Sequence, residues 1–149
     1  MLLALQERLK TLIEADTYFE GVAILTEQLG NILAAYQEAI DKLGFCIVIE
    51  VSAGESIERS PVGPAFRELF TISISQGVLT DDQAATRNVV DGLEHAVLAI
   101  HGQPADAGDP DGLTFLVRNH WAGRTDGGEA VQQLSVEVVH AVSVPAEVP

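Results

Sequence analysis

The chain has 149 residues, of which 47% are hydrophobic and 5% aromatic, and its net charge is −14. This length and composition allow one domain with a mostly aliphatic core, which argues against disorder of the whole chain. The 22 acidic residues outnumber the 8 basic ones, and the basic residues do not cluster as binding to a phosphate backbone requires. Tight binding of nucleic acid is therefore disfavoured.

The cellular compartment is indicated by the cysteine content and the N-terminus. The single cysteine, Cys46, lies in an apolar run, so we expect a small buried hydrophobe and no internal disulfide. Glu7, Arg8 and Lys10 interrupt the apolar N-terminus too early for a signal peptide. No apolar run reaches the length of a membrane span. The sequence therefore predicts synthesis in the cytoplasm and no membrane association.

Two helices are predicted before the first strand. Leucines at helical spacing predict a helix over 2–14, and residues 15–25 are expected to form an ordered connection. A second helix is predicted over 26–43, with Thr26 as its N-cap and Gly44 at its C-cap. We expect its apolar stripe to face the core: Leu29, Ile32, Leu33, Tyr36, Ile40 and Leu43.

The middle of the chain predicts two strands and a third helix. The apolar run 45–51 is typical of a strand that is covered on both faces or lies in the centre of a sheet. Residues 52–64 are rich in Gly, Pro and Ser and are expected to form an exposed loop. Alternation over 70–75 predicts a half-buried strand. A capping box at 80–83 opens a helix that is expected to end near His101.

Two further strands complete the predicted fold. A strand over 113–121 is followed by a turn over 122–128 and a long alternating strand over 131–144, which should form an antiparallel hairpin. Residues 145–149 are expected to be a loose tail. The sequence predicts one α+β domain over 1–149, with a single, mostly antiparallel sheet of about four strands. The predicted order is helix, helix, strand, strand, helix, strand, strand.

Motifs for catalysis and metal binding are weak. Asp91 and His95 share a helix face and resemble part of an inverted zinc-protease motif, but a surface Asp–His pair is favoured. The acidic segment 106–112 fails as a calcium loop, because Arg118 takes the place of the final Glu. We therefore expect no enzyme activity, no metal and no cofactor. The alternative function from another class is a small acidic hydrolase or ligand-binding domain. Its site would lie around Asp91, Glu94, His95 and His140.

A few residues are candidates for contacts with other proteins. Trp121 lies beside Arg124 in the sequence, and both residue types are enriched at binding hot spots. A Trp that covers one end of the core is an equal alternative. His140, on the apolar side of the last strand, is expected to be a core or interface histidine. An acidic inhibitor that mimics nucleic acid is disfavoured, because the carboxylates are spread along the chain.

The order of these segments resembles a known family. Residues 18–27, the helix after them and the run 43–49 resemble the start of small bacteriophage or prophage tail-assembly proteins of the tail terminator or tail-completion kind. The segment 64–66 that leads into a strand, the helix over 80–101 and the hairpin over 113–144 are similar too. The resemblance implies an α+β subunit of a homo-oligomeric ring.

The resemblance also implies partners and a location. Such rings are typically hexameric, cap the tail tube in the virion and join it to neck or connector proteins. DNA passes through them without being specifically bound, and the family has no catalytic residues or cofactors. The implied contact residues are Glu55, Ile57 and Arg59 in the loop 52–64, Trp121 and Arg124 around the following turn, and His140 in the last strand. A head-completion or neck protein is the alternative within this class.

Overall fold

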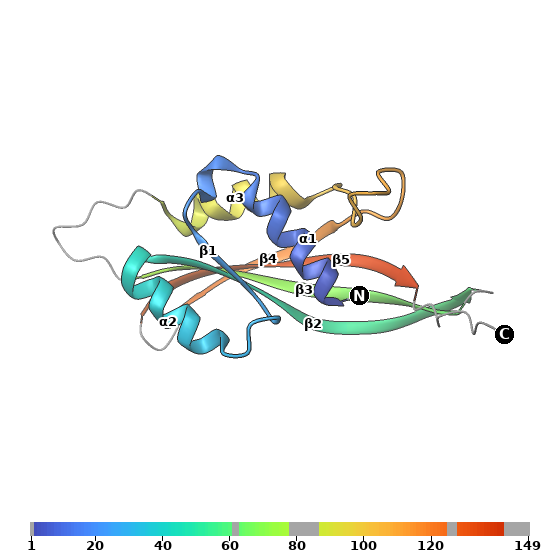
Figure 1. Cartoon of the computed structure of the whole chain (residues 1–149), viewed down its shortest axis with the longest axis horizontal. Helices are drawn as coiled ribbons and strands as arrows, with labels where there is room; N and C mark the ends of the chain where they lie inside the picture. Colours follow the sequence, from blue (N-terminus) through green and yellow to red (C-terminus); the bar gives the residue numbers. More distant parts are fainter. Residues whose placement is uncertain (1, 61–62, 78–86, 125–127, 142–149) are drawn as a thin grey trace.

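The computed structural model describes residues 2–60, 63–77, 87–124 and 128–141, with the side chains of 56–60, 63–65 and 140–141 excepted. These ranges form α-helices and one five-stranded sheet (Figure 1). The elements in chain order are α1 (Leu2–Glu14), a 3-10 turn (Thr17–Phe19), β1 (Ala23–Thr26), α2 (Ile32–Leu43), β2 (Phe45–Ser60), β3 (Gly63–Gln76), α3 (Val89–Ile100), β4 (Leu116–Arg124) and β5 (Ala130–Ala141). The predicted α+β class with a single sheet is confirmed.

The strand order in the sheet is β1-β2-β3-β5-β4. The pairs β2–β3, β3–β5 and β4–β5 are antiparallel, so the predicted closing hairpin is present. The fifth strand, β1, was not predicted and pairs parallel with β2, with Ile24 opposite Ile47. A parallel pair needs a crossover connection, which α2 supplies. Because β1 has only four residues, its alternation was too short to be recognised.

The predicted start of the second helix is wrong. Thr26 ends β1, and its hydroxyl donates a hydrogen bond to Glu7 Oε1 at 3.0 Å instead of capping a helix. The helix begins at Ile32, where the side chain of Asn31 accepts a hydrogen bond from the Ala34 amide at 3.1 Å. Asparagine satisfies an amide that the first helical turn leaves without a partner, so the cap lies five residues later than predicted.

The predicted end of this helix is confirmed, since Gly44 adopts the left-handed conformation at φ 67°. The third helix begins at Val89, and Asn88 is its cap, accepting from the Asp91 amide at 2.8 Å. A continuous helix from residue 80 is therefore wrong, because residues 87 and 88 are not helical. The capping box at 80–83 lies outside the described residues.

The predicted loop over 52–64 is instead part of a long hairpin. The β2–β3 ladder runs from Phe45 opposite Gln76 to Ser60 opposite Gly63, with an irregularity between Val51 and Ala53. The Gly, Ser and Pro residues of this segment suggested a loop. Pairing with β3 instead provides partners for its backbone N–H and C=O groups, and a bulge at the irregularity accommodates the one residue that has no partner in β3. Residues 61 and 62 lie outside the described ranges.

The last predicted turn is also shorter than expected. Ala122, Gly123 and Arg124 continue β4 and pair with β5, so these three residues are not part of a turn. Residues 125–127 lie outside the described ranges. The strand itself begins at Leu116 rather than Leu113. Residues 142–144 of the predicted long strand and the tail 145–149 lie outside the described residues.

One face of the sheet carries the main core. Helices α1 and α3 lie side by side on this face (Figure 1), and their apolar side chains pack against all the central strands. Residues with no solvent exposure include Leu9 and Ile13 of α1, Ile100 of α3, and Ile47, Ile72, Ile74 and Leu134 of the strands. Burial of this area supplies most of the hydrophobic stabilisation of the fold.

Among the described residues, α2 is the one helix on the opposite face. Beneath α2 lies a small cluster of Leu25, Ala39, Cys46 and Val48. The run 45–49 is thus covered on both faces, as predicted. However, Ala39 is the one buried residue of α2, and Leu33 is 70% exposed. The expectation that the whole apolar stripe of this helix faces the core is therefore wrong, because α2 packs mainly over β1 and β2.

None of the helices in the described ranges has the length and hydropathy of a membrane span.

Candidate assembly surface

Part of the sheet on the α2 side has no helix over it among the described residues. Cross-strand register places most of its residues on one face. Arg118, at the irregularity of β4, joins them through its contact with Glu137. We call this surface the open face; it consists of Glu50 and Glu55 on β2, Arg67, Leu69, Thr71 and Ser73 on β3, Gln133, Ser135 and Glu137 on β5, and Leu116, Arg118, Asn119, Trp121 and Gly123 on β4.

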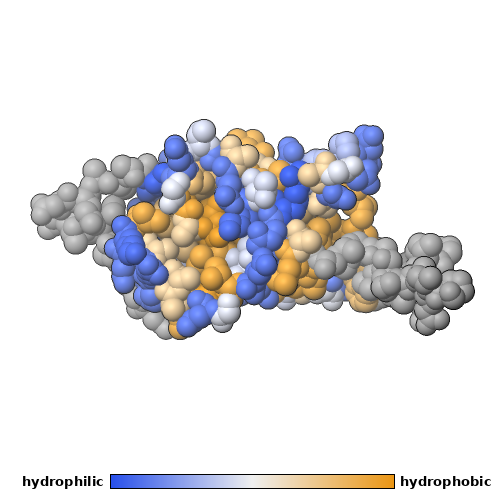
Figure 2. All heavy atoms as spheres, in the orientation of Figure 1, coloured by the Kyte–Doolittle hydropathy of each residue, from blue (hydrophilic) through white to orange (hydrophobic). Residues whose placement is uncertain are grey.

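A groove separates α2 from the open face. Its volume is about 520 Å³, and it is lined by residues of α2 and of four strands, including Ile32, Leu33, Val48, Val131, Glu50 and Arg124. Leu33 stands exposed at its rim. Figure 2 shows hydrophilic residues along the outer side of α2, where Glu38 and Lys42 are exposed. The helix is thus amphipathic, but much of its apolar side borders an open groove rather than a filled core.

Trp121 is held in place on the open face. It is 39% exposed, and its indole N–H donates a hydrogen bond to Oε1 of Gln133. Gln133 in turn donates from Nε2 to the hydroxyl of Ser73 at 2.9 Å. This row of hydrogen bonds crosses three neighbouring strands, so little side-chain freedom remains for a partner to remove.

Two arginines flank a nearly buried glutamate on the same face. Glu137, whose side chain is 10% exposed, has Arg67 Nε at 2.8 Å and Arg118 Nε at 3.0 Å from its two carboxylate oxygens. The Arg67 contact is an ion pair without the geometry of a hydrogen bond. Glu55 adds a longer contact of 3.7 Å to Arg67. The arrangement fixes two partly exposed arginine side chains next to each other, which suits recognition of carboxylates.

The sequence-predicted contact residues fall into two groups. Glu55 and Trp121 lie on the open face, whereas Arg124, at the end of β4, lines the groove and donates to the Gly128 carbonyl at 3.3 Å. The side chains of Ile57, Arg59 and His140 lie outside the described part of the chain. Register places Ile57 opposite Ala65 and His140 opposite Phe66.

The residues that sequence reasoning missed are Leu33, Arg67, Arg118 and Glu137. Alternation did assign Glu137 to the wet side of its strand, but the two arginines lie 70 and 19 residues earlier in the chain. Only the strand order brings them together, with β5 between β3 and β4.

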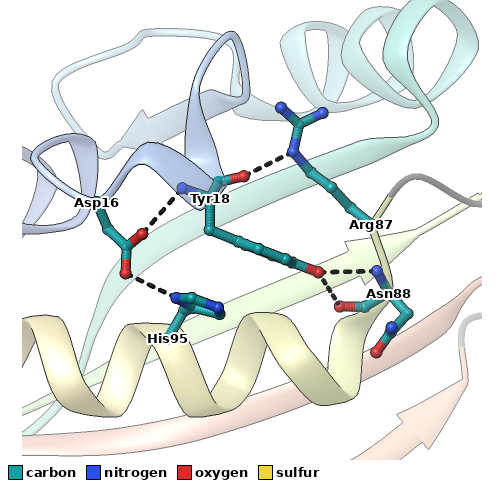
Figure 3. A network of polar contacts seen from close by, with 5 residues as sticks. All are labelled: Asp16, Tyr18, Arg87, Asn88 and His95. Atoms are coloured by element: carbon teal, nitrogen blue, oxygen red, sulfur yellow. Dashed lines mark hydrogen bonds and ion pairs between the residues drawn. The ribbon is translucent and has the colours of Figure 1, made fainter.

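A second polar cluster joins the turn after α1 to α3 (Figure 3). His95 Nδ1 lies 2.9 Å from Asp16 Oδ2, and the imidazole is stacked on the Tyr18 ring with centroids 4.3 Å apart. The Tyr18 hydroxyl accepts from the Asn88 amide at 3.0 Å, and Arg87 Nε donates to the Tyr18 carbonyl at 2.7 Å. The cluster fastens the start of α3 to the N-terminal segment.

The favoured Asp91–His95 pair is wrong. Asp91 Oδ2 instead accepts from Asn88 Nδ2 at 2.7 Å, next to the helix cap, while His95 pairs with Asp16. Burial raises the pKa of Asp16, but the Tyr18 amide and His95 lower it by more, so it lies below its ordinary value. Asp16 is therefore ionised at neutral pH. Within the described ranges, no three His, Cys, Asp or Glu side chains are grouped closely enough to hold a metal ion.

Cys46 is a buried hydrophobe, as predicted. It has no solvent exposure, and burial raises the pKa of its thiol to about 11. The thiol therefore stays protonated at neutral pH and is a poor nucleophile.

Comparisons with known proteins leave the family open. No protein-family model matches the chain, and no curated protein matches it. Two solved structures from Akkermansia muciniphila show weak similarity. One is 15% identical, covering 97% of this chain and 79% of its own, with a TM-score of 0.33. The other, solved without its transmembrane region, is 17% identical, covering 95% and 86%, with a TM-score of 0.30. Scores this low carry no inference about fold or function.

Proposed function

We propose that the protein is a structural virion protein: a ring-forming tail terminator or tail-completion protein that caps a phage tail tube and joins it to the neck. The proposal includes a homo-oligomeric, typically hexameric ring, and no catalytic activity. A head-completion or neck connector protein is the closest alternative, since it would also be a small α+β ring subunit. The family resemblance of the sequence supports both.

The observation that carries an assembly role is the unequal covering of the sheet. Helices α1 and α3 bury one face, whereas the open face has an anchored tryptophan, two fixed arginines and an apolar groove. Such a mixture of apolar and charged groups with little conformational freedom is typical of a protein–protein contact surface. A partner that covers the open face and the groove would complete the burial of α2.

The charge of the chain is compatible with a ring around DNA. A net charge of −14 for each subunit would repel the phosphate backbone, so DNA could pass without binding. The carboxylates would then have to face the lumen or the solvent rather than one another at subunit contacts.

A small hydrolase is the alternative from another class, and the Asp16–His95 pair is the observation that favours it. A carboxylate can orient a catalytic imidazole. However, Asp16 also accepts the Tyr18 amide, and His95 is stacked on Tyr18, so the cluster has a structural use in joining α3 to the turn.

Size-exclusion chromatography with light scattering, over a concentration series and followed by negative-stain imaging, tests the assembly role. A discrete oligomer with a central hole supports the tail or neck function. A monomer at every concentration that is unchanged by added tail tubes contradicts it. Metal that stays bound after dialysis would favour the hydrolase.

A further inference from the structure

We infer that the open face binds the outer side of α3 of a second copy of this chain, an inference that rests on the proposed ring. A ring of more than two identical subunits needs two different contact surfaces on each subunit. The open face is one of them. Its partner surface must therefore lie elsewhere on the same molecule, and α3 packs on the opposite face of the sheet (Figure 1).

The distribution of exposed charge separates these two surfaces. Among the described residues, the exposed basic residues are Lys42 on α2 and Arg118 and Arg124 on β4. Within the described ranges, the basic residues of the layer of α1, α3 and their adjoining loops are Arg8, Lys10 and Arg87, all of them half-buried. The exposed acidic residues of this layer are Glu14, Glu20, Asp91, Glu94, Asp106, Asp109 and Asp111. The α2 side also has exposed carboxylates, at Glu38, Asp41, Glu50 and Glu55, so the two sides are not complementary as wholes. The complementarity is local: among the described residues, the outer side of α3 has carboxylates and no exposed cation, whereas the strands beside the groove supply Arg118 and Arg124.

Each of the two surfaces also has a strongly exposed leucine. Leu98 on α3 is 78% exposed and Leu33 beside the groove is 70% exposed, the two highest values among the exposed large hydrophobic residues. Val90, Asp91, Glu94 and Leu98 are all exposed, and their spacing puts them on one side of α3. This side of α3 therefore presents an apolar side chain next to two carboxylates.

The open face offers the matching groups. The groove has an apolar lining that includes Leu33 and Val131, and Arg124 also lines it. In the proposed contact, Leu98 of one copy enters the groove of the next, and Glu94 faces Arg124. Trp121 is hydrogen-bonded to Gln133, which lines the groove. Trp121 therefore becomes covered in the same contact. Because the two surfaces differ, the contact repeats from copy to copy and can close into a ring.

A charge exchange tests the pairing. The variants Arg124→Glu and Glu94→Arg each place like charges at every contact, so each should weaken the oligomer at least about tenfold in dissociation constant. The double variant restores opposite charges at every contact and should recover to within about threefold of the original chain. Glu38→Arg is the matched control, because Glu38 lies on the side of α2 opposite Leu33 and Tyr36 and should leave assembly unchanged.

Fluorescence gives a second readout, because Trp121 is the single tryptophan of the chain. Its emission should move to shorter wavelength as the oligomer forms. An oligomer that survives both single variants, a double variant no better than the singles, or emission that does not move on assembly would each overturn this pairing and leave the ring intact. A strictly monomeric original chain would instead overturn the proposed function and the pairing together.

Discussion

The two faces of the sheet use similar residues for different purposes. Under α1 and α3, helical side chains such as Leu9 and Ile100 have no solvent exposure, whereas α2 buries only Ala39 and leaves Leu33 70% exposed. Both helical layers are amphipathic in sequence. The difference shows that an apolar stripe on a helix indicates a surface that has to be shielded from water, and no more than that. Whether the chain itself or another chain covers it depends on how many strands the helix reaches.

The largest expected difference between the faces is in the free energy of unfolding when a leucine is changed to alanine, once in α1 and once in α2. Leu9→Ala on α1 should lower the free energy of unfolding by about 3 kcal/mol, because it leaves a cavity in a filled core. Leu33→Ala on α2 should cost less than about 0.5 kcal/mol in the monomer, since the side chain is largely exposed. Urea denaturation at low protein concentration measures both. Equal losses would show that the open face is already covered within one subunit.

The same contrast applies to two glycines. A Cβ at Gly92 of α3 would lie 3.1 Å from Phe45 Cζ and 3.3 Å from Ile74 Cγ2, whereas nothing lies within 4 Å of one at Gly123 of β4. Gly92→Val should therefore destabilise the fold by about 2 kcal/mol through overpacking. Gly123→Val should leave the monomer as stable or slightly more stable, because valine favours strands. Thermal unfolding distinguishes them; a destabilising Gly123→Val would contradict an uncovered strand.

A smaller effect is expected at the arginines of the open face. Glu137→Gln removes the carboxylate that lies between Arg67 and Arg118, so the two cations repel each other. We expect a loss of about 1 kcal/mol, reduced by solvent because both arginines are partly exposed, and partly recovered at high salt. Glu38→Gln is the control, since its ion pair with Lys42 is largely exposed and should matter less. Denaturation at two salt concentrations compares them, and equal losses would contradict the special position of Glu137.

The smallest effect concerns the cluster that fastens α3. The folded state lowers the pKa of Asp16, so its ionised form stabilises the fold above the unfolded-state pKa. That contribution is lost as the pH falls through the folded-state pKa. The difference in unfolding free energy between the original chain and Asp16→Asn should be constant near neutral pH and shrink in acid. Asp111→Asn, in an exposed loop, should show no such trend. A difference that stays the same at every pH would contradict the Asp16–His95 pairing.

Part of the candidate surface was predictable from residue type. Trp121 and Arg124 were selected as hot-spot residues; Trp121 lies on the open face, and Arg124 lines the groove next to it. The Asp91–His95 pair was wrong, because helical spacing shows which residues share a face but not which neighbour competes for them. His95 is bound by Asp16, 79 residues away in the chain. Long-range partners of this kind have no local signal.

The sequence by itself determined the features that depend on local periodicity and composition. These are the α+β class, the first helix, the buried run 45–49, the left-handed Gly44 and the closing hairpin. The sequence could determine them because helical and strand periods show directly in the spacing of apolar residues. Only the tertiary structure decided that β1 joins the sheet in parallel, that 52–60 continues β2, and that α2 packs mainly over β1 and β2. Each depends on pairing between distant segments, and that pairing determines which face of the sheet stays open.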